Sequence, residues 1–254
     1  MMSVLGLVLS TTAQDRFDKT VSHDSQLQVY REKLQNGSGY YAEAERFAVR
    51  IGELLSEALI KAVEKETFVE FQKELATEFL TPLLRSAYET IADACKNAQL
   101  ALNRKAGINL DAVKFAFPGD RAANLAEKLS SYLTTEDAMW VLGEPVVSFC
   151  LNLVDEAVRV NAEALAAAGF LPRVRRISDS ATCAFCNTHA GVYVPPLNAD
   201  AFRRHERCRC LILLDVDSKP NAYIQRLYAD ANASVRDARI ARVLAAENKA
   251  TRNG

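Results

Sequence analysis

The chain has 254 residues, of which 49% are hydrophobic and 25% charged, a balance that is typical of globular proteins and excludes a disordered or fibrous one. Its length suits one large domain or two smaller ones. The formal net charge is only −1, but residues 173–254 carry 14 Lys or Arg against 8 Asp or Glu, and the preceding residues carry 17 against 24. This division predicts an acidic front part and a basic back part with different roles.

The first apolar stretch, SVLGLVLS at residues 3–10, has the composition of the hydrophobic region of a secretory signal. No Lys or Arg precedes it and it is too short to span a bilayer, so we interpret it as a buried or partner-binding segment. We expect residues 1–40 to form an N-terminal arm, because their few apolar residues cannot make a core alone. No other stretch indicates a membrane span, and the sequence therefore predicts no membrane partner.

Apolar residues spaced by three and four predict long helices after residue 40. The first begins at Tyr41. A second apolar stripe runs from Phe68 to Cys95 and contains Pro82, which either kinks the helix or begins a new one. We expect these helices, together with a shorter one at residues 121–133, to form a helical domain over residues 41–143.

A further helix is predicted between Pro145, which suits a first turn, and Ala168, with Gly169 as the residue that ends it. TTED at residues 134–137 also reads as a helix start. After Pro172 the pattern changes to strands, in RVRRIS, GVYV and CRCLILLDVD. From residue 219 a ragged apolar stripe predicts a C-terminal helix over residues 219–254.

Four of the six cysteines and two of the three histidines lie between residues 182 and 212. A C-x-x-C pair comes first, and H-x-x-C-x-C follows after 18 intervening residues. One tight turn lets a C-x-x-C pair direct two thiolates at a single ion, and zinc prefers thiolate and imidazole in a tetrahedral arrangement. The pattern predicts a zinc site with five candidate ligands: Cys183, Cys186, His205, Cys208 and Cys210.

Our leading set of ligands is Cys183, Cys186, His205 and Cys208, with Cys210 as the alternative to Cys208. The competing interpretations are a disulfide, or free thiols packed as small hydrophobic groups. The fold class that we predict is mainly α: a helical N-terminal body, a small α+β zinc-knot module at residues 144–218 that metal would hold together, and a C-terminal helix.

Other cysteines and histidines carry weaker signals. His189, three residues after Cys186, can substitute as a ligand, but a surface or hydrogen-bonding role is favoured. Cys95 and Cys150 lie on apolar helical stripes and are interpreted as core residues.

Residues 145–216 resemble the Mu F-like minor head proteins of tailed bacteriophages. The resemblance rests on a helix with an Asn and a terminal Gly, a strand with an Arg, then D-x-x-T-C-x-x-C, a variable loop, and H-x-x-C-x-C before a hydrophobic strand. The matching positions are Asn161, Gly169, Arg176, Asp179, Thr182, Cys183, Cys186, His205, Cys208 and Cys210. The chain departs from the family at Ala184, where Pro is frequent, and at the Arg203–Arg204 insertion before His205.

The resemblance implies a structural minor head protein inside the phage capsid, made in the host cytoplasm and then located in the virion. Its expected partners are the portal protein, packaged DNA through backbone phosphates, and the major capsid protein. A related actinophage branch is labelled capsid maturation protease, which gives the alternative function of a head-processing enzyme.

The residues themselves favour a structural protein over an enzyme. The chain has no G-x-S-x-G motif and no H-E-x-x-H motif, and five donors are available to fill four zinc positions, so no position is left for catalysis. We therefore predict no enzyme activity. Arginine suits phosphate and carboxylate groups, and we expect a basic rim to contact DNA or an acidic partner through Arg175, Arg176, Arg203, Arg204 and Arg207. The alternative interpretation is a solvated charged rim around the zinc site.

Overall fold

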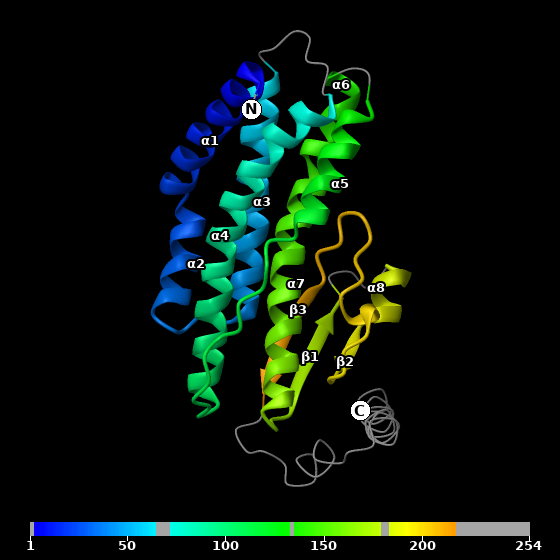
Figure 1. Cartoon of the computed structure of the whole chain (residues 1–254). Coiled ribbons are helices and arrows are strands. Elements are labelled where there is room, and N and C mark those ends of the chain that lie inside the picture. The colour runs from blue at the N-terminus through cyan, green and yellow to red at the C-terminus, as the bar shows by residue number, and fades with distance from the viewer. Residues whose placement is uncertain (1–2, 65–71, 133–134, 179–182, 217–254) are drawn as a thin grey trace.

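The computed structural model describes residues 3–64, 72–132, 135–178 and 183–216, and the statements below refer to these residues. The fold is mainly helical, with a small antiparallel sheet on one side of a helical bundle (Figure 1). The predicted C-terminal helix at residues 219–254 lies outside the described residues. The elements in chain order are α1 (Val4–His23), α2 (Ser25–Gln35), α3 (Tyr41–Val63), α4 (Lys73–Lys105), α5 (Gly119–Ser130), α6 (Thr135–Ala138), the 3₁₀ helix η1 (Met139–Leu142), α7 (Glu144–Ala167), β1 (Pro172–Ile177), α8 (Ala184–His189), β2 (Gly191–Tyr193), the 3₁₀ helix η2 (Ala199–Ala201) and β3 (Leu211–Val216).

Helices α1 and α2 belong to the bundle. They follow one another along α3 and α4 (Figure 1), and Leu9, Phe17 and Leu27 are each at most 2% exposed. At their junction, Asp24 caps α2 by accepting the N–H of Leu27 and pairs with Arg50 of α3 at 2.7 Å. We predicted an N-terminal arm at residues 1–40; in the structure the apolar residues of α1 and α2 complete a core that α3 and α4 provide.

The most extensive helix contact joins α3 to α7. Gly52 of α3 allows this close approach: a Cβ atom at this position would lie 2.8 Å from the Cα of Val147. The predicted helix limits are confirmed for both elements, since Tyr41 begins α3, and Pro145 lies in the first turn of α7. Gly169, just after α7, has a φ of +87°, which a helix-terminating glycine adopts readily.

The stretch Glu136–Ala167 is long and apolar enough to cross a membrane by length and composition alone. The expectation that no stretch beyond the N-terminal one is apolar enough to cross a membrane is wrong. Its most apolar segment is 56% buried inside the protein, where α7 contacts α3, α4, β1 and β3. A core helix with neighbours on several sides needs apolar residues on several faces, so this composition also suits a buried helix.

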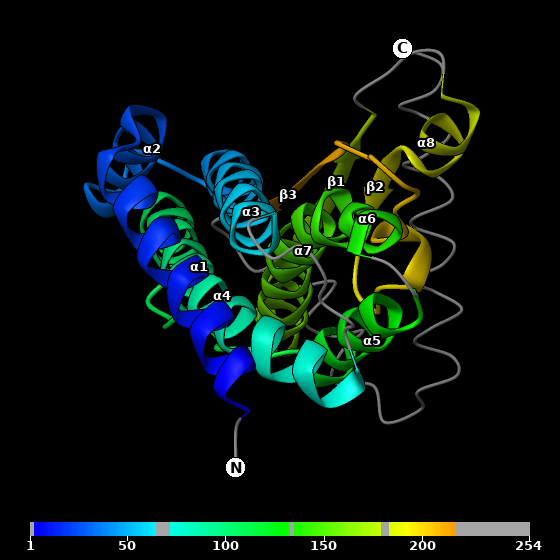
Figure 2. The same cartoon turned by 90° about the horizontal axis from the view of Figure 1, so that it is seen from above.

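The three strands are ordered β2-β1-β3, and both pairs are antiparallel. Val174 of β1 lies opposite Tyr193 of β2 and Leu214 of β3. Val174, Ile212 and Leu214 join the same buried cluster as the helices, on the side of the sheet that contacts α3 and α7. Figure 2 shows the sheet on the opposite side of α7 from α1.

The predicted boundary between a helical domain at residues 41–143 and a module at residues 144–218 does not coincide with a break in helix packing. The physical reason is that α7, assigned to the module, packs most extensively against α3, assigned to the domain. One hydrophobic core extends from Leu9 to Val216.

Replacing Gly52 by Ala should destabilise the protein, because the added methyl group meets the backbone of α7 and forces the two helices apart. We expect a decrease of about 1–3 kcal/mol in the free energy of unfolding, measured by urea denaturation. Gly119→Ala is the matched control, since nothing lies within 4 Å of a Cβ atom there. A Gly52→Ala variant as stable as the Gly119→Ala variant would contradict this account of the α3–α7 contact.

Candidate metal centre

Five candidate ligands converge beside the sheet, from two segments of the chain. Cys183 precedes α8 as its N-cap, and Cys186 lies in the first turn of that helix. His205, Cys208 and Cys210 lie in the loop that joins η2 to β3. This loop folds back over the start of α8, so that the C-x-x-C and H-x-x-C-x-C motifs meet.

The distances between the ligand atoms suit a metal ion. The Cys186 and Cys208 sulfurs are 3.9 Å apart, close to the edge of about 3.8 Å that a tetrahedron with metal–sulfur bonds of about 2.3 Å requires. The Nε2 of His205 lies 3.3 Å from the Cys183 sulfur and 2.9 Å from the Cys186 sulfur. Ligand atoms lie within 4.8 Å of one another in two sets that share Cys186: Cys183, Cys186 and His205, and Cys186, Cys208 and Cys210. The cluster can therefore hold a metal ion.

Hydrogen bonds prepare His205 and Cys183 for metal ligation. The Nδ1 of His205 lies 2.6 Å from the carbonyl oxygen of Glu206. A carbonyl only accepts, so Nδ1 carries the proton and the lone pair of Nε2 faces the sulfurs, as in metal-binding histidines. The backbone N–H of Cys186 donates to the Cys183 sulfur, which fixes the position of this sulfur at the start of α8.

The local environment also favours a thiolate at Cys208. Burial raises the pKa of this thiol, but the backbone N–H and the thiol of Cys210, together with the Arg204 guanidinium, bring the pKa below its usual value. Cys186, Cys208 and Cys210 are at most 2% exposed. The ring of Phe185 packs edge-on against His205 at 5.4 Å and covers the cluster further.

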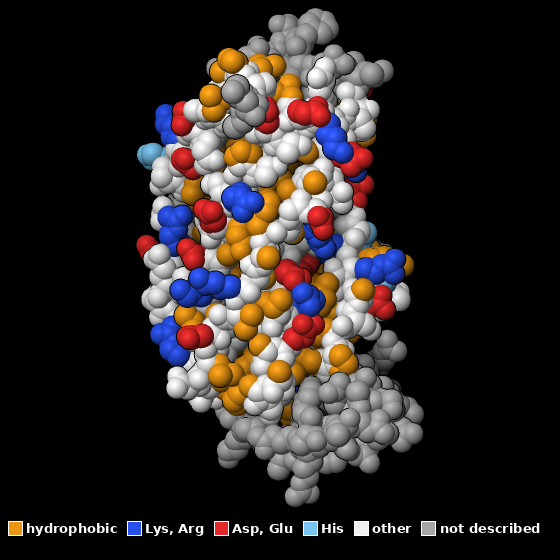
Figure 3. Space-filling view, viewed as in Figure 1, with side chains coloured by type: hydrophobic (Ala, Val, Ile, Leu, Met, Phe, Trp, Pro, Cys, Tyr) orange, Lys and Arg blue, Asp and Glu red, His pale blue; other side chains and the backbone are white. Residues whose placement is uncertain are grey.

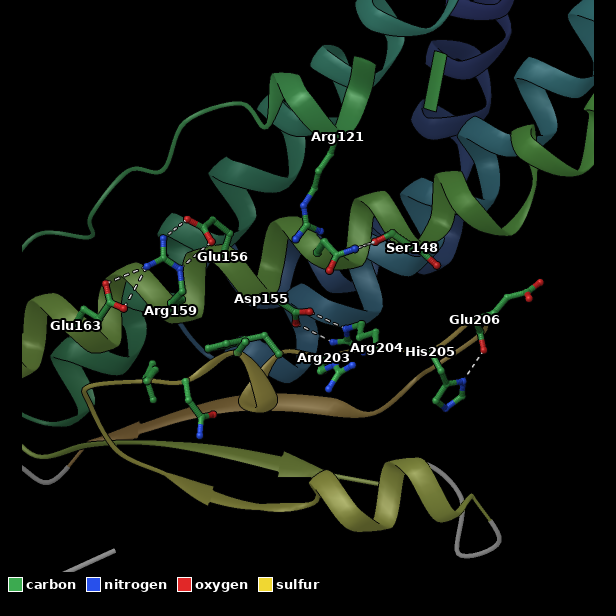
Figure 4. Close-up of a pocket in the computed structure, with 15 residues that line it drawn as sticks. Arg121, Ser148, Asp155, Glu156, Arg159, Glu163, Arg203, Arg204, His205 and Glu206 are labelled. Atoms are coloured by element: carbon green, nitrogen blue, oxygen red, sulfur yellow. Dashed lines mark hydrogen bonds and ion pairs between the residues drawn. The ribbon is translucent and has the colours of Figure 1, made fainter. Parts of the chain in front are cut away.

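A buried ion-pair network holds the loop between η2 and β3 (residues 202–210), which carries three of the candidate ligands and is called the metal loop below, on the helical bundle. The guanidinium of Arg204 donates to both carboxylate oxygens of Asp155 on α7, each at 2.7 Å, and to Glu45 on α3 at 3.0 Å. It also donates to the carbonyl of Cys210 at 2.8 Å. Figure 4 shows Arg204 and Asp155 facing each other between the loop and α7.

The network consists of two acids and one base, and all three side chains are at most 6% exposed. Burial raises the pKa of Glu45 to about 7, although Arg204 acts in the opposite direction. Burial lowers the pKa of Arg204, but Asp155 and Glu45 outweigh this effect and raise it above its usual value. The carboxylates thus depend on Arg204 for their charge compensation.

The sequence analysis missed Glu45 and Asp155. Asp155 interrupts the apolar run around Leu153, Val154 and Val158 of α7, and Glu45 is a buried residue within the apolar stripe of α3. A lone carboxylate on a buried helix face is a signal that a cationic partner is required, but it does not identify that partner.

Two of the five arginines predicted to form a basic rim are buried, and for these the prediction is wrong. Arg204 is taken up by the network above. Arg176 is 1% exposed and donates to the carbonyl of Asp200, and its Nε and Nη2 have no hydrogen-bond partner among the described residues. Both side chains hold the loop between β2 and β3 in place. Arg175, Arg203 and Arg207 are exposed, and their role as contact residues stays a prediction.

His189 lies outside both ligand sets. Its Nδ1 donates to the carbonyl of Phe185, and its ring stacks on that of Phe185 at 4.3 Å. Cys95 and Cys150 are buried in the helical core, as predicted, and burial raises the pKa of Cys150 to about 12. Neither thiol belongs to the cluster.

A polar cleft of about 680 Å³ lies between α7 and the metal loop (Figure 4). Its acidic residues on α7 are largely paired within the protein: Glu156 and Glu163 with Arg159, and Asp155 with Arg204. Arg121 of α5 and Arg203 of the loop also line it.

Comparisons of the chain with family models, curated proteins and solved structures give no match. The likeness to phage minor head proteins therefore depends on the motif residues themselves. Two of these residues have structural roles in the fold: Asn161 holds the segment before α5 by accepting the N–H of Val113 at 2.8 Å, and Gly169 ends α7.

The cluster thiols and the core thiols should differ in reactivity. We expect iodoacetamide to modify Cys183 of the metal-free folded protein well before Cys95 or Cys150, because Cys183 is partly exposed and accepts a hydrogen bond, whereas the core thiols are buried with raised pKa values. Peptide mass spectrometry over a time course measures this order. Equal modification of Cys150 and Cys183 under folded conditions would contradict the assignment.

Proposed function

We propose that the cluster binds one zinc ion through Cys183, Cys186, His205 and Cys208. Zinc is the metal that fits best, because three thiolates and one imidazole match its preferred ligands and its tetrahedral geometry. Cys208 is the leading fourth ligand because its sulfur lies 3.9 Å from that of Cys186, and Cys210, which belongs to the same ligand set, is the alternative. Four protein ligands complete the coordination, so this ion would stabilise the fold and leave no position for a substrate.

We further propose that the protein is a structural minor head protein of a tailed bacteriophage, associated with the portal and needed for head assembly and for DNA packaging or ejection. The single observation that supports this most is the cluster itself: the C-x-x-C and H-x-x-C-x-C motifs, in the order that the family shows, meet in two sets of three ligand atoms that share Cys186. Asn161, Gly169 and Arg176, which also carry the resemblance, serve the fold.

Binding to the portal or to DNA phosphates would use the arginines that stay exposed. Arg203 has 65% of its side chain exposed and pairs only loosely, at 3.9 Å, with Asp200. Arg207 lies in the metal loop with a φ of +58° and is also exposed. The face of the molecule in Figure 3 carries cations and anions intermixed, so the contact we propose is a local one beside the metal loop.

The zinc proposal predicts about one zinc per chain in protein purified under reducing conditions, measured by elemental analysis. Cys183→Ser should lower this content strongly, whereas Cys150→Ser, which changes a core thiol, should leave it unchanged. Metal-free wild-type protein with a Cys183–Cys186 disulfide would disprove the proposal.

The structural-protein proposal predicts that Arg203→Glu combined with Arg207→Glu impairs incorporation into phage heads, or yields heads that package or eject DNA poorly. The reversal of two exposed charges beside the metal loop should weaken a contact with phosphates or with an acidic partner. Quantitative mass spectrometry of purified particles measures incorporation. Lys19→Glu with Lys33→Glu is the control, since both lysines are exposed on α1 and α2.

The alternative, a head-processing protease, predicts a different result. His189 lies outside the zinc ligands, 3.8 Å from the carboxylate of Asp200, and its replacement by Ala would then leave capsid protein uncleaved in particles with normal amounts of this chain. We expect normal cleavage in His189→Ala particles. Uncleaved capsid protein there would favour the enzyme.

A further inference from the structure

We propose that Arg204 couples the metal centre to the helical bundle, so that metal binding and the packing of α3 on α7 stabilise each other. Glu45 and Asp155 are then positioning residues of the metal centre, although they lie 159 and 49 residues from Arg204 in the sequence. The inference rests on the proposed zinc centre and adds to it a dependence on two helices.

The first step of the argument is the position of Arg204 in the metal loop. It directly precedes the ligand His205, and its guanidinium donates to the carbonyl of Cys210 at 2.8 Å, so it spans the loop that carries three of the five donors. A metal ion that fixes His205 and Cys208 restricts the backbone on which this side chain is placed. Loss of the ion removes that restriction.

The second step is the cost of moving Arg204. Asp155 receives two hydrogen bonds from the guanidinium and Glu45 receives one, and both carboxylates are almost entirely buried. Without the cation, two acids on neighbouring helices would lie near each other in the interior without charge compensation. Breaking a buried ion pair in this way is strongly destabilising. The loop and the α3–α7 contact therefore depend on each other.

The third step is a second link from Glu45. Its Oε2 accepts the backbone N–H of Ile212 at 3.0 Å, at the second residue of β3 and two residues after Cys210. One side chain of α3 thus holds both the metal loop, through Arg204, and the strand that follows the loop. This arrangement directs the donors at Cys208 and Cys210 toward Cys186.

Coupling of this kind is reciprocal: if the network improves metal affinity, metal must stabilise the network by the same free energy. Residues that orient metal ligands typically change metal affinity by about 10–100-fold when mutated. Direct ligation alone predicts no effect of Asp155, whose carboxylate belongs to neither of the two ligand sets.

The test is the zinc affinity of Asp155→Asn, measured on the full chain by competition with a chromogenic chelator. We expect binding about 10–100-fold weaker than in the wild type. Glu163→Gln is the matched control, because Glu163 lies on the same helix and pairs with an arginine, but at the surface. Circular dichroism of each protein shows whether the helices are folded.

If Asp155→Asn does not fold, a second variant tests the coupling between the network and zinc binding. Glu45→Leu, Asp155→Leu and Arg204→Met together replace the network by apolar side chains, a change that buried ion-pair networks frequently tolerate. We expect this variant to fold and to bind zinc more weakly, and zinc should raise the thermal midpoint of its unfolding less than that of the wild type.

Two results would overturn the inference while zinc binding by the wild type stands: an affinity of Asp155→Asn equal to that of Glu163→Gln, or a folded triple variant with wild-type affinity and wild-type stabilisation by zinc. A wild-type protein that binds no zinc overturns the zinc centre itself, and with it this inference. The two failures are therefore distinguishable.

Discussion

The guanidinium of Arg204, buried between Asp155 of α7 and Glu45 of α3, is the interaction on which the rest of the structure depends. A buried arginine is acceptable only where its charge is compensated and its donors are used, and here two carboxylates and the carbonyl of Cys210 meet that requirement. The same contact places the loop with His205, Cys208 and Cys210 opposite Cys183 and Cys186. The metal centre and the helical bundle are therefore parts of one folded unit.

The local elements were predictable from the sequence because their signals are local. The apolar spacing after Tyr41 defines α3, Pro145 and Gly169 mark the two ends of α7, and the alternation in RVRRIS indicates β1. The cluster of candidate ligands was also predictable, because C-x-x-C and H-x-x-C-x-C spacings restrict which side chains can share an ion. The structure places the five candidate donors in two sets of three that share Cys186.

Long-range features were not predictable in the same way. The sequence of residues 1–40 has too few apolar residues for a core of its own. Its first apolar stretch suggests a buried or partner-binding segment, but nothing in it indicates that Leu9 and Leu27 join the core of α3 and α4. Likewise, Arg176 and Arg204 stand among exposed arginines in the sequence, and only the fold separates them: one supports the β2–β3 loop and the other joins two helices. A run of charges does not reveal which member has a buried partner.

This arrangement has a consequence for function. If zinc binding and helix packing are coupled, the C-x-x-C and H-x-x-C-x-C motifs serve the stability of the whole protein, which would suit the structural role that we propose. In the proposed function, the exposed Arg203 and Arg207 would be contact residues on a loop that a bound metal ion would hold rigid. Metal binding would then affect partner binding only indirectly, by fixing the loop that carries Arg203 and Arg207.

Hydrogen–deuterium exchange of the wild-type protein, with zinc bound and after its removal by a chelator, tests the coupling most directly. The account predicts that zinc removal lowers protection in three places together: the start of β3 around Ile212, α3 around Glu45, and α7 around Asp155. Faster exchange confined to residues 183–216, with α3 and α7 unchanged, would contradict it.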